Sequence, residues 1–318
     1  MRPFIRGAVL FLLVLTGTAF GLDRMLKTGL RERTTDVYGV WNRIVRGDIR
    51  SNVLFCGSSR ALVHFDAAHI GERIGHTCDN IGMDGTQLDL QLARLRTLLR
   101  HCPPPRVIVQ EVDIISLTPD SGLYFDQQYL PYLDEPAVRQ AVYRIEPDAW
   151  MDRWIPLHGF MRHDMGLTYL ALQGIMHLED TLNDPVHRGF ELRDRAWEGS
   201  FDHFLEKHRD GIRYPTDTTA QRTLRTIIRT AQEAGAQVVL CYAPELVENQ
   251  LITLNRAEIM DIYRRIAKEA GIPFWDFSKA TFSNDRAYFY NSQHMNAKGV
   301  ALFTPMIADS LRNLPALR

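Results

Sequence analysis

The sequence predicts an α/β fold, a three-layer α/β/α sandwich around a doubly wound parallel sheet of about five strands. Short apolar runs alternate with amphipathic helical segments, as in proteins with a parallel sheet covered on both faces. The composition is that of an ordinary globular protein, with 45% hydrophobic and 24% charged residues. A helical insertion and an N-terminal membrane helix complete the predicted architecture.

Five short runs have the apolar character of buried strands. They span residues 52–57, 77–82, 106–112, 236–242 and 272–277. Leucines recur at helical spacing between Gln87 and His101, a second amphipathic helix covers 217–234 with Gly235 placed as its C-terminal cap, and a third helix ends at Gly271. Crossovers in parallel sheets are right-handed. The strand order 2-1-3-4-5 is taken by analogy with flavodoxin-like folds.

Residues 116–215 interrupt this alternation. The stretch is rich in aromatic residues and in helix-like segments that lack strand character. We expect a helical insertion between the third and fourth strands, near the edge of the sheet where ligands bind. Its aromatic side chains either pack a small helical cap or stack on sugar rings.

The N-terminus carries the clearest non-globular feature. Arg2 and Arg6 precede an apolar run of 16 residues from Gly7 to Leu22, somewhat short of the roughly 20 that cross a bilayer comfortably. No A-x-A cleavage site follows, which favours an uncleaved signal-anchor over a cleavable signal peptide or a buried core helix. The positive-inside tendency then places the protein in the cytoplasmic membrane as a single-pass protein with its domain on the periplasmic side.

The expected organisation is therefore a signal-anchor over residues 1–25, a linker or helix over 26–50, and one domain over 51–318 that contains the insertion. A formal net charge of −1 argues against a nucleic-acid binder. Neither G-x-G-x-x-G nor G-x-x-x-x-G-K-[ST] occurs after a predicted strand, so no cofactor is expected.

The four cysteines show no metal-binding spacing, and no metal is expected. Cys56 and Cys241 lie in apolar runs and are interpreted as buried thiols. Cys78 lies at the start of one predicted strand, and Cys102 comes shortly before the next. In an exported chain they could form a disulfide, and the sequence leaves this open.

Polar residues gather where the predicted strands end, the edge at which open α/β sheets bind ligands. A serine needs a base to become a nucleophile, histidine is the usual base, and backbone N–H groups stabilise the oxyanion. Ser59 is therefore the candidate nucleophile and His294 the candidate base, with the backbone amides of Ser59 and Gly82 as oxyanion donors. The remaining candidates for the oxyanion or substrate site are Ser58, Arg60 and Asn80, with Arg60 as a possible ligand for an anionic substrate.

Three motifs resemble blocks of the SGNH/GDSL hydrolases: V-L-F-C-G-S-S-R, N-I-G-M-D-G and N-S-Q-H-M-N-A-K-G. The resemblance covers roughly residues 50–115 and 235–312. It is nearest to the envelope branch, which includes alginate O-acetylation proteins and the D-alanyl-lipoteichoic acid export protein. The resemblance implies an O-acetyltransferase or esterase acting on a surface polysaccharide or glycolipid, beside a membrane-bound O-acyltransferase.

The motifs depart from the family pattern in two places. Asn291 stands where the family has the acid of a catalytic triad, and an Asp-to-Asn change in a serine protease triad lowers kcat about 10⁴-fold. The acid could instead come from one of four other residues: Asp276, Asp285, Glu111 or Asp113. The third block, G-x-N-D, is absent, so one oxyanion donor is missing. The alternative function is therefore a catalytically impaired accessory protein that binds glycan or the O-acyltransferase.

Overall fold

The computed structural model describes residues 2–85, 87–119, 122–179, 181, 184 and 186–318. The chain forms two compact units, which are described separately. The smaller consists of Met1–Arg43 and Phe125–Asn183, and the larger of Ile44–Tyr124 and Asp184–Arg318. This division differs from the expected one. The inserted segment is shorter than 116–215 and joins the N-terminal residues, because residues 184–215 cluster with the sheet.

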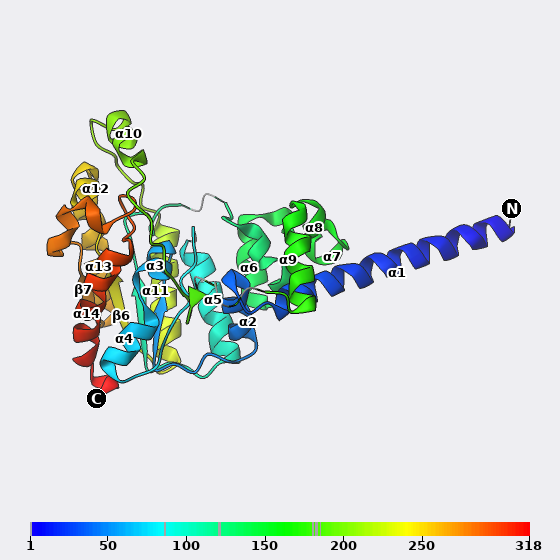
Figure 1. Cartoon of the computed structure of the whole chain (residues 1–318), viewed down its shortest axis with the longest axis horizontal. Coiled ribbons are helices and arrows are strands. Elements are labelled where there is room, and N and C mark those ends of the chain that lie inside the picture. The colour runs from blue at the N-terminus through cyan, green and yellow to red at the C-terminus, as the bar shows by residue number, and fades with distance from the viewer. Residues whose placement is uncertain (1, 86, 120–121, 180, 182–183, 185) are drawn as a thin grey trace. The chain divides into compact units, whose positions relative to one another are not determined.

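The larger unit is built on a parallel five-stranded sheet with the order β2-β1-β3-β6-β7 (Figure 1). The strands are β1 (Val53–Cys56), β2 (Cys78–Asn80), β3 (Val107–Glu111), β6 (Gln237–Tyr242) and β7 (Phe274–Asp276). All five lie within the predicted runs, and the order 2-1-3-4-5 is confirmed. The chain leaves β1 in one direction to form β2 and returns on the other side to form β3. The carboxyl ends of β1 and β3 therefore flank the switch point, where such sheets bind ligands.

Helices cover both faces of this sheet, which confirms the three-layer architecture. One face packs against α3 (Ser59–His64), α4 (Ala67–Ile74) and α14 (Ala297–Arg312). The other layer consists of α5 (Leu88–His101), α11 (Thr218–Glu233) and α13 (Arg256–Ala270). Residues 184–215, expected to lack strands, contain the short hairpin β4 (Val186–His187) and β5 (Phe190–Glu191), followed by α10 (Ser200–Lys207). Two-residue strands are too short to show a periodic pattern.

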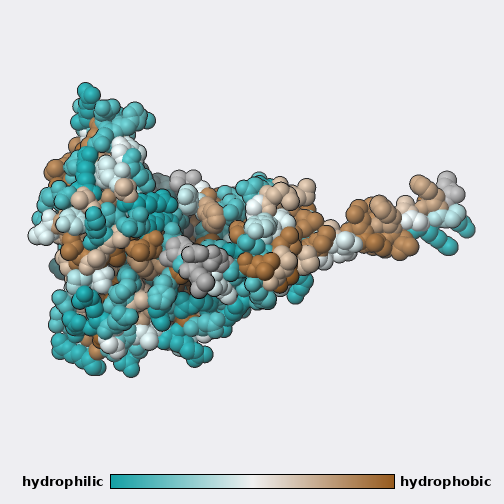
Figure 2. Space-filling view, in the orientation of Figure 1, coloured by the Kyte–Doolittle hydropathy of each residue, from teal (hydrophilic) through white to brown (hydrophobic). Residues whose placement is uncertain are grey.

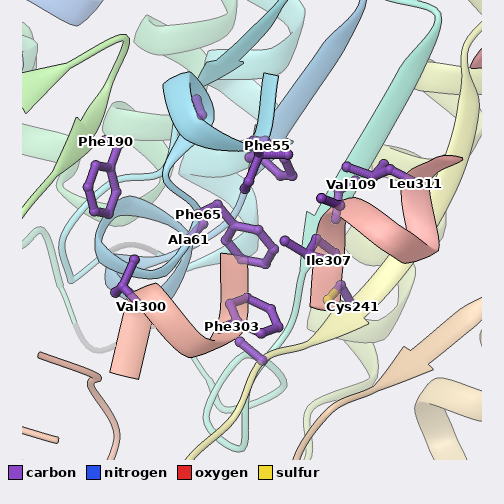
Figure 3. Close-up of a cluster of buried hydrophobic side chains, with 14 of the residues drawn as sticks. Phe55, Ala61, Phe65, Val109, Phe190, Cys241, Val300, Phe303, Ile307 and Leu311 are labelled. Carbon is purple, nitrogen blue, oxygen red and sulfur yellow. The ribbon is translucent and has the colours of Figure 1, made fainter. Parts of the chain in front are cut away.

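A buried aromatic stack joins α3 and α14 to the sheet (Figure 3). The ring of Phe65, which follows α3, stacks on Phe55 of β1 with centroids 4.9 Å apart. Its other side meets the ring of Phe303 from α14 edge-on at 5.4 Å. Because α3 begins at Ser59 and α14 begins just after His294, this packing holds the two candidate catalytic segments against one sheet.

The disulfide left open by the sequence is not formed. All four cysteines are buried thiols that form no disulfide, as expected for Cys56 and Cys241. The Cys102 thiol donates a hydrogen bond to the carbonyl oxygen of Ile44 at 3.4 Å, while Cys78 begins β2. Burial raises the pKa of the Cys78 thiol to about 12, so this thiol is a poor thiolate nucleophile.

The smaller unit is helical. It contains α1 (Arg2–Glu32), the start of α2 (Asp36–Val45), α6 (Pro136–Ile145), α7 (Trp150–Trp154), α8 (His158–Met161) and α9 (Met165–Met176). Helix α1 continues past the expected end at residue 25, and it is long and apolar enough to cross a membrane. Its apolar part is exposed and forms the brown, hydrophobic length of helix in Figure 2.

Helices α1 and α9 touch through their backbones. A Cβ atom on Gly29 would overlap the carbonyl oxygen of Ala171, and one on Gly174 would overlap the carbonyl oxygen of Gly29. Small residues permit such close approach between helices. The C-terminal part of α1, around Gly29, is therefore held against α9.

The aromatic stack can be tested on α14 with a neighbouring residue as control. Phe303→Ala should destabilise the larger unit by about 3–5 kcal/mol, because the ring is fully buried and leaves a cavity. Leu302→Ala removes a side chain that is 41% exposed and should have a much smaller effect. Chemical denaturation in detergent, followed by tryptophan fluorescence, measures both. Equal effects of the two substitutions would show that the stack contributes no special stability.

Candidate active site

Ser59 lies at the switch point because a tight turn links β1 to α3. Gly57 in this turn has φ +152°, and a Cβ atom there would overlap the side chains of Ala61 and Glu111. Ser58 is the N-cap of α3, and its hydroxyl accepts a hydrogen bond from the Arg60 N–H at 3.4 Å. Ser58 and Arg60 are buried, whereas Ser59 is partly exposed. Ser59 is therefore the residue of this turn whose hydroxyl can meet a substrate.

His294 lies on a narrow loop that leads into α14. An antiparallel bridge joins Phe289 to Met295, and the Tyr290 N–H donates to the His294 carbonyl oxygen at 3.0 Å. The side chain of Asn296 then caps the first turn of α14. Local structure thus explains the N-A-K-G part of the motif. Asn296 caps α14, and the three residues that follow form the first turn of this helix.

The structure brings together Ser59, His294 and Asn291, the three residues expected to be catalytic. The Ser59 Oγ lies 2.8 Å from His294 Nε2, and His294 Nδ1 lies 2.9 Å from Asn291 Oδ1. The same Asn291 Oδ1 accepts the backbone N–H groups of Gln293 at 3.0 Å and His294 at 2.9 Å. These donors fix the orientation of the amide, so His294 Nδ1 carries the proton. The lone pair of Nε2 then faces the Ser59 hydroxyl, as a general base requires.

None of the four alternative acids accepts the Nδ1 proton of His294. Asp285 accepts the Ala287 N–H at 2.9 Å, and Asp276 accepts the Ser278 N–H at 3.1 Å. Glu111 and Asp113 lie instead beside Ser58, whose hydroxyl is 2.7 Å from Asp113 Oδ2 and 3.3 Å from Glu111 Oε2. Within the described part of the chain, Asn291 is therefore the residue whose side chain accepts the His294 Nδ1 proton.

Arg60 does not have the substrate-binding position expected from the sequence. It is 1% exposed and lies 3.6 Å from Glu111 and 3.7 Å from Glu245. Its guanidinium also donates to the carbonyl oxygens of Ala243 and Pro244, just after β6. A buried arginine requires such partners. Arg60 therefore links α3 to the residues that follow β6, in the interior of the protein.

Asn80 and Gly82 also differ from expectation. The Asn80 side chain is buried and donates to the carbonyl oxygens of Ala61 at 2.7 Å and Phe65 at 3.0 Å. Its Oδ1 accepts the Gly82 N–H at 2.8 Å, so this amide is already bonded and is not available to an oxyanion. A Cβ atom on Gly82 would overlap the backbone nitrogen of Leu62. Glycine is therefore required here for close packing of the second block against α3.

The backbone N–H of Ser59, expected to be an oxyanion donor, lies at the start of α3. Ser59 is the first residue of α3, where helical N–H groups have no partner within the helix. No described residue accepts a hydrogen bond from it. The N-terminus of a helix also carries partial positive charge, which favours an anion at this point.

Two residues that the sequence did not single out support His294. The Nε2 atom of the buried His64 accepts the Met295 N–H at 3.0 Å. This bond holds the loop that carries His294 against the protein interior. The ring of Tyr290 stacks on that of His294, with centroids 5.4 Å apart and planes 4° apart. Tyr290 directly precedes the N-S-Q-H motif and could have been suspected, whereas nothing in the sequence marks His64.

Arg193 is a further charged group near the site that the sequence did not indicate. It pairs with Asp84 at 2.8 Å and with Glu191 at 2.7 Å. Asp84 follows Gly82 by two residues and belongs to the second sequence block. Burial and the charge of Arg60 lower the pKa of His294 most, and the charge of Arg193 acts in the same direction. Burial raises the pKa of Tyr290 to about 12, and Arg193 opposes this rise. Arg193 therefore contributes to the electrostatics of the base.

The histidine is a weak base. Burial lowers the pKa of His294 to about 4, and the charge of Arg60 acts in the same direction against the opposing effect of Asp84. A charged partner at Nδ1 would raise this pKa, but Asn291 is neutral. His294 is consequently neutral at pH 7 and able to accept a proton, although its imidazolium has no carboxylate to stabilise it.

An open cleft of about 430 Å³ lies against His294 and Asn291. Its other walls come from the start of α10, from Tyr214 before α11, and from Asn249 of α12 (Val247–Ile252). Beyond these two residues it is lined by Glu198, Ser200, Phe201, Phe204, Tyr214, Asn249, Ser292 and Gln293. Aromatic rings, amides and a carboxylate around an open cleft can accommodate a polar ligand with apolar faces.

Comparison with known proteins gives remote likenesses only. No family model and no curated protein match the chain. Among solved structures, a candidate acylhydrolase from Bacteroides fragilis has 13% identity and a TM-score of 0.41, covering 84% of this chain and 88% of that one. An acetyl xylan esterase has 12% identity and a TM-score of 0.42, covering 81% of this chain and 98% of that one. A candidate SGNH hydrolase from Slackia heliotrinireducens has 11% identity and a TM-score of 0.41, covering 83% of this chain and 100% of that one. Identities and TM-scores this low say nothing of activity, which has to be inferred from the side chains of the site.

The pKa of His294 can be tested through the pH dependence of ester turnover. A base works only when neutral, so kcat/KM for an activated acetyl ester should hold down to about pH 4 and fall below it. Asn291→Asp places a negative charge on the acceptor of Nδ1 and raises this pKa. The acidic fall should then occur at higher pH, and kcat at neutral pH should rise several-fold. Asn291→Ala, which removes the acceptor, should lower kcat. An Asn291→Asp profile that does not move would contradict the assigned contact.

Proposed function

We propose that the chain is an acyl-ester enzyme of the cell envelope, an O-acetyltransferase or esterase acting on a surface polysaccharide or glycolipid. The observation that carries this proposal is the hydrogen-bonded series of Ser59, His294 and Asn291 at the carboxyl edge of a doubly wound sheet. The sequence motifs around these residues resemble SGNH/GDSL hydrolases, which supports the same assignment.

In the proposed reaction, Ser59 Oγ attacks the acyl carbonyl carbon while its proton passes to His294 Nε2. The Ser59 N–H donates to the oxyanion of the tetrahedral intermediate. When the bond to the leaving alcohol breaks, that alcohol takes the proton from His294, and an acyl-serine remains. Water or a glycan hydroxyl then attacks the acyl group while its proton passes to His294 Nε2. The bond between the acyl carbon and Ser59 Oγ then breaks, and Ser59 takes the proton back from His294. Water gives hydrolysis, and a sugar hydroxyl gives acyl transfer.

The cleft beside His294 supports a glycan as the acyl donor or acceptor. Phe204 and Tyr214 are partly exposed rings that can pack against a sugar ring, while Phe201 is buried and stacks on Phe204. Glu198 and Asn249 offer hydrogen-bonding groups. The ring of Phe204 is tilted against His208, with centroids 4.4 Å apart. Because the cleft is open, a polymer could enter without its ends having to pass through the site.

The proposed location is the periplasmic side of the cytoplasmic membrane, with α1 as the anchor. The apolar length of α1 supports its role as an anchor. A membrane-bound O-acyltransferase is the proposed partner, since such an enzyme would supply acyl groups at the same surface. No nucleic acid is expected to bind.

The second candidate function is a catalytically impaired accessory protein that binds glycan. Two observations favour it. Asn291 cannot stabilise an imidazolium by charge, and the Gly82 N–H is bonded to Asn80 instead of pointing to an oxyanion. With a single identified oxyanion donor, turnover would be slow. The same cleft would then serve only to hold the polysaccharide.

Labelling by a fluorophosphonate probe separates these functions. The full chain should become labelled, because the probe needs only an activated serine. Ser59→Ala should abolish labelling while the melting temperature stays within a few degrees, since Ser59 is partly exposed. Ser310→Ala on α14 is the control and should label as the wild type does. An unlabelled wild-type chain would favour the accessory function.

Reporter fusions test the proposed location. A reporter joined after residue 40 should be active only if it is of a kind that works outside the cytoplasm. Replacing Arg2 and Arg6 by glutamate should weaken this orientation, because positive charges before a span hold its N-terminus in the cytoplasm. Activity of a cytoplasmic reporter in the wild-type fusion would refute the envelope location.

A further inference from the structure

We infer that the helical unit binds the outer surface of the membrane directly, through an apolar rim formed by Trp150, Trp154, Ile155 and Met161, with anionic lipid headgroups held at an adjacent basic cleft. The inference rests on the proposed insertion of α1 and goes beyond it. An anchor alone would only tether the chain, whereas this contact would seat the helical unit on the bilayer.

The rim lies at the level where α1 would leave the membrane. The apolar run of α1 ends at Leu22, and Asp23 is the next residue. Asp23 Oδ1 accepts the Leu157 N–H at 3.0 Å, and Lys27 donates to the Asp152 carbonyl oxygen at 2.8 Å. These bonds place the segment that carries the rim beside the first charged turns of α1.

The rim side chains are exposed although they are apolar. Trp150 is 46% exposed, Trp154 59%, Ile155 40% and Met161 81%. A grouped apolar surface of this kind marks a contact with a partner or a membrane. Tryptophan is enriched at membrane–water interfaces because its ring is apolar and its N–H is polar. The guanidinium of Arg153 lies 4.4 Å from the centroid of the Trp154 ring, an arrangement that joins a basic group to the rim.

A cleft of about 270 Å³ next to the rim has the charge that lipid headgroups require. It is lined by the cations of Arg24, Lys27, Arg31 and Arg153 and by the two acids Asp23 and Asp134. Asp134 pairs with both Arg31 and Arg153, and Asp23 pairs with Lys27. Arg24 has no acidic partner among the described residues. The excess of positive charge at this level matches the phosphates of anionic lipids.

The length of the anchor gives an independent reason for a lipid partner. The uncharged run of 16 residues would span about 24 Å as a helix, less than the roughly 30 Å of a hydrocarbon core. A short span can be accommodated by thinning the bilayer or by snorkelling of its flanking residues. The rim lies directly beyond Leu22, so its insertion would add apolar surface at the end of the span.

Tryptophan quenching in vesicles tests the proposal on the full chain. The protein is reconstituted into vesicles of phosphatidylethanolamine and phosphatidylglycerol whose acyl chains carry bromine close to the headgroup. Fluorescence of the wild type should be quenched. The Trp150→Phe, Trp154→Phe double variant keeps an apolar rim but should lose the quenching. The control variant Trp275→Phe, in the other unit, should remain quenched as the wild type is.

Each outcome decides a different point. If Arg24→Gln together with Arg153→Gln weakens quenching in phosphatidylglycerol vesicles, the basic cleft contributes as proposed. Quenching that does not depend on these arginines would overturn the headgroup part. A chain that floats with the vesicles but is not quenched refutes the lipid contact alone and leaves the rim to a membrane-protein partner. A chain that does not float refutes the anchor as well, while ester turnover by Ser59 would still be tested separately by the fluorophosphonate probe.

Discussion

The side-chain oxygen of Asn291 determines how the whole site works. It accepts three N–H groups, two from the backbone of its own loop and one from the His294 ring. The backbone bonds hold the loop in the shape that aims His294 at Ser59, and the ring bond selects the tautomer with a free Nε2. An aspartate would make the same bonds and add a charge. In an ordinary triad the acid both orients the histidine and carries a negative charge. Asn291 orients His294 in the same way but carries no charge.

The surroundings of the histidine reinforce this separation. The positive charge of Arg60 lies close enough to lower the pKa of His294, and Arg60 is itself held by buried Glu111 and Glu245. Burial, followed by the charge of nearby Asp113, raises the pKa of Glu111 to about 8, so this carboxyl group is largely protonated at neutral pH. A neutral Glu111 offsets less of the charge of Arg60. The buried charges around Ser58 thus favour a neutral His294 and disfavour the imidazolium that the proposed attack would form.

The sequence predicted the fold well because the relevant signals are local. Glycines and polar residues at strand ends, prolines after a helix and leucines at helical spacing each act within a few residues. The five strands follow from such signals, whereas their order comes from fold analogy. The pairing of Ser59 with His294 is expected because both follow strand ends at one edge of the sheet. The roles of Arg60, Asn80 and Gly82 were misjudged, because each depends on a partner brought near by folding: Glu245, the carbonyl groups of α3, and the Asn80 side chain. The unit boundaries were misplaced for the same reason. Aromatic composition marks a helical segment but does not show that Phe125–Asn183 packs on α1.

A base with a low pKa has a definite consequence for the chemistry of the proposed enzyme. Such a histidine takes a proton from serine reluctantly, but once protonated it is a strong acid and returns the proton readily to a leaving oxygen. The difficult step is then formation of the tetrahedral intermediate, and departure of the alcohol is easy. A substrate whose carbonyl is already activated, such as an acyl group on a good leaving group, suits this balance better than an unactivated sugar ester. The site therefore fits the acceptance of an acyl group from an activated donor more closely than the hydrolysis of a stable acetyl glycan, and a transferase is the form of the proposed function that its electrostatics favour.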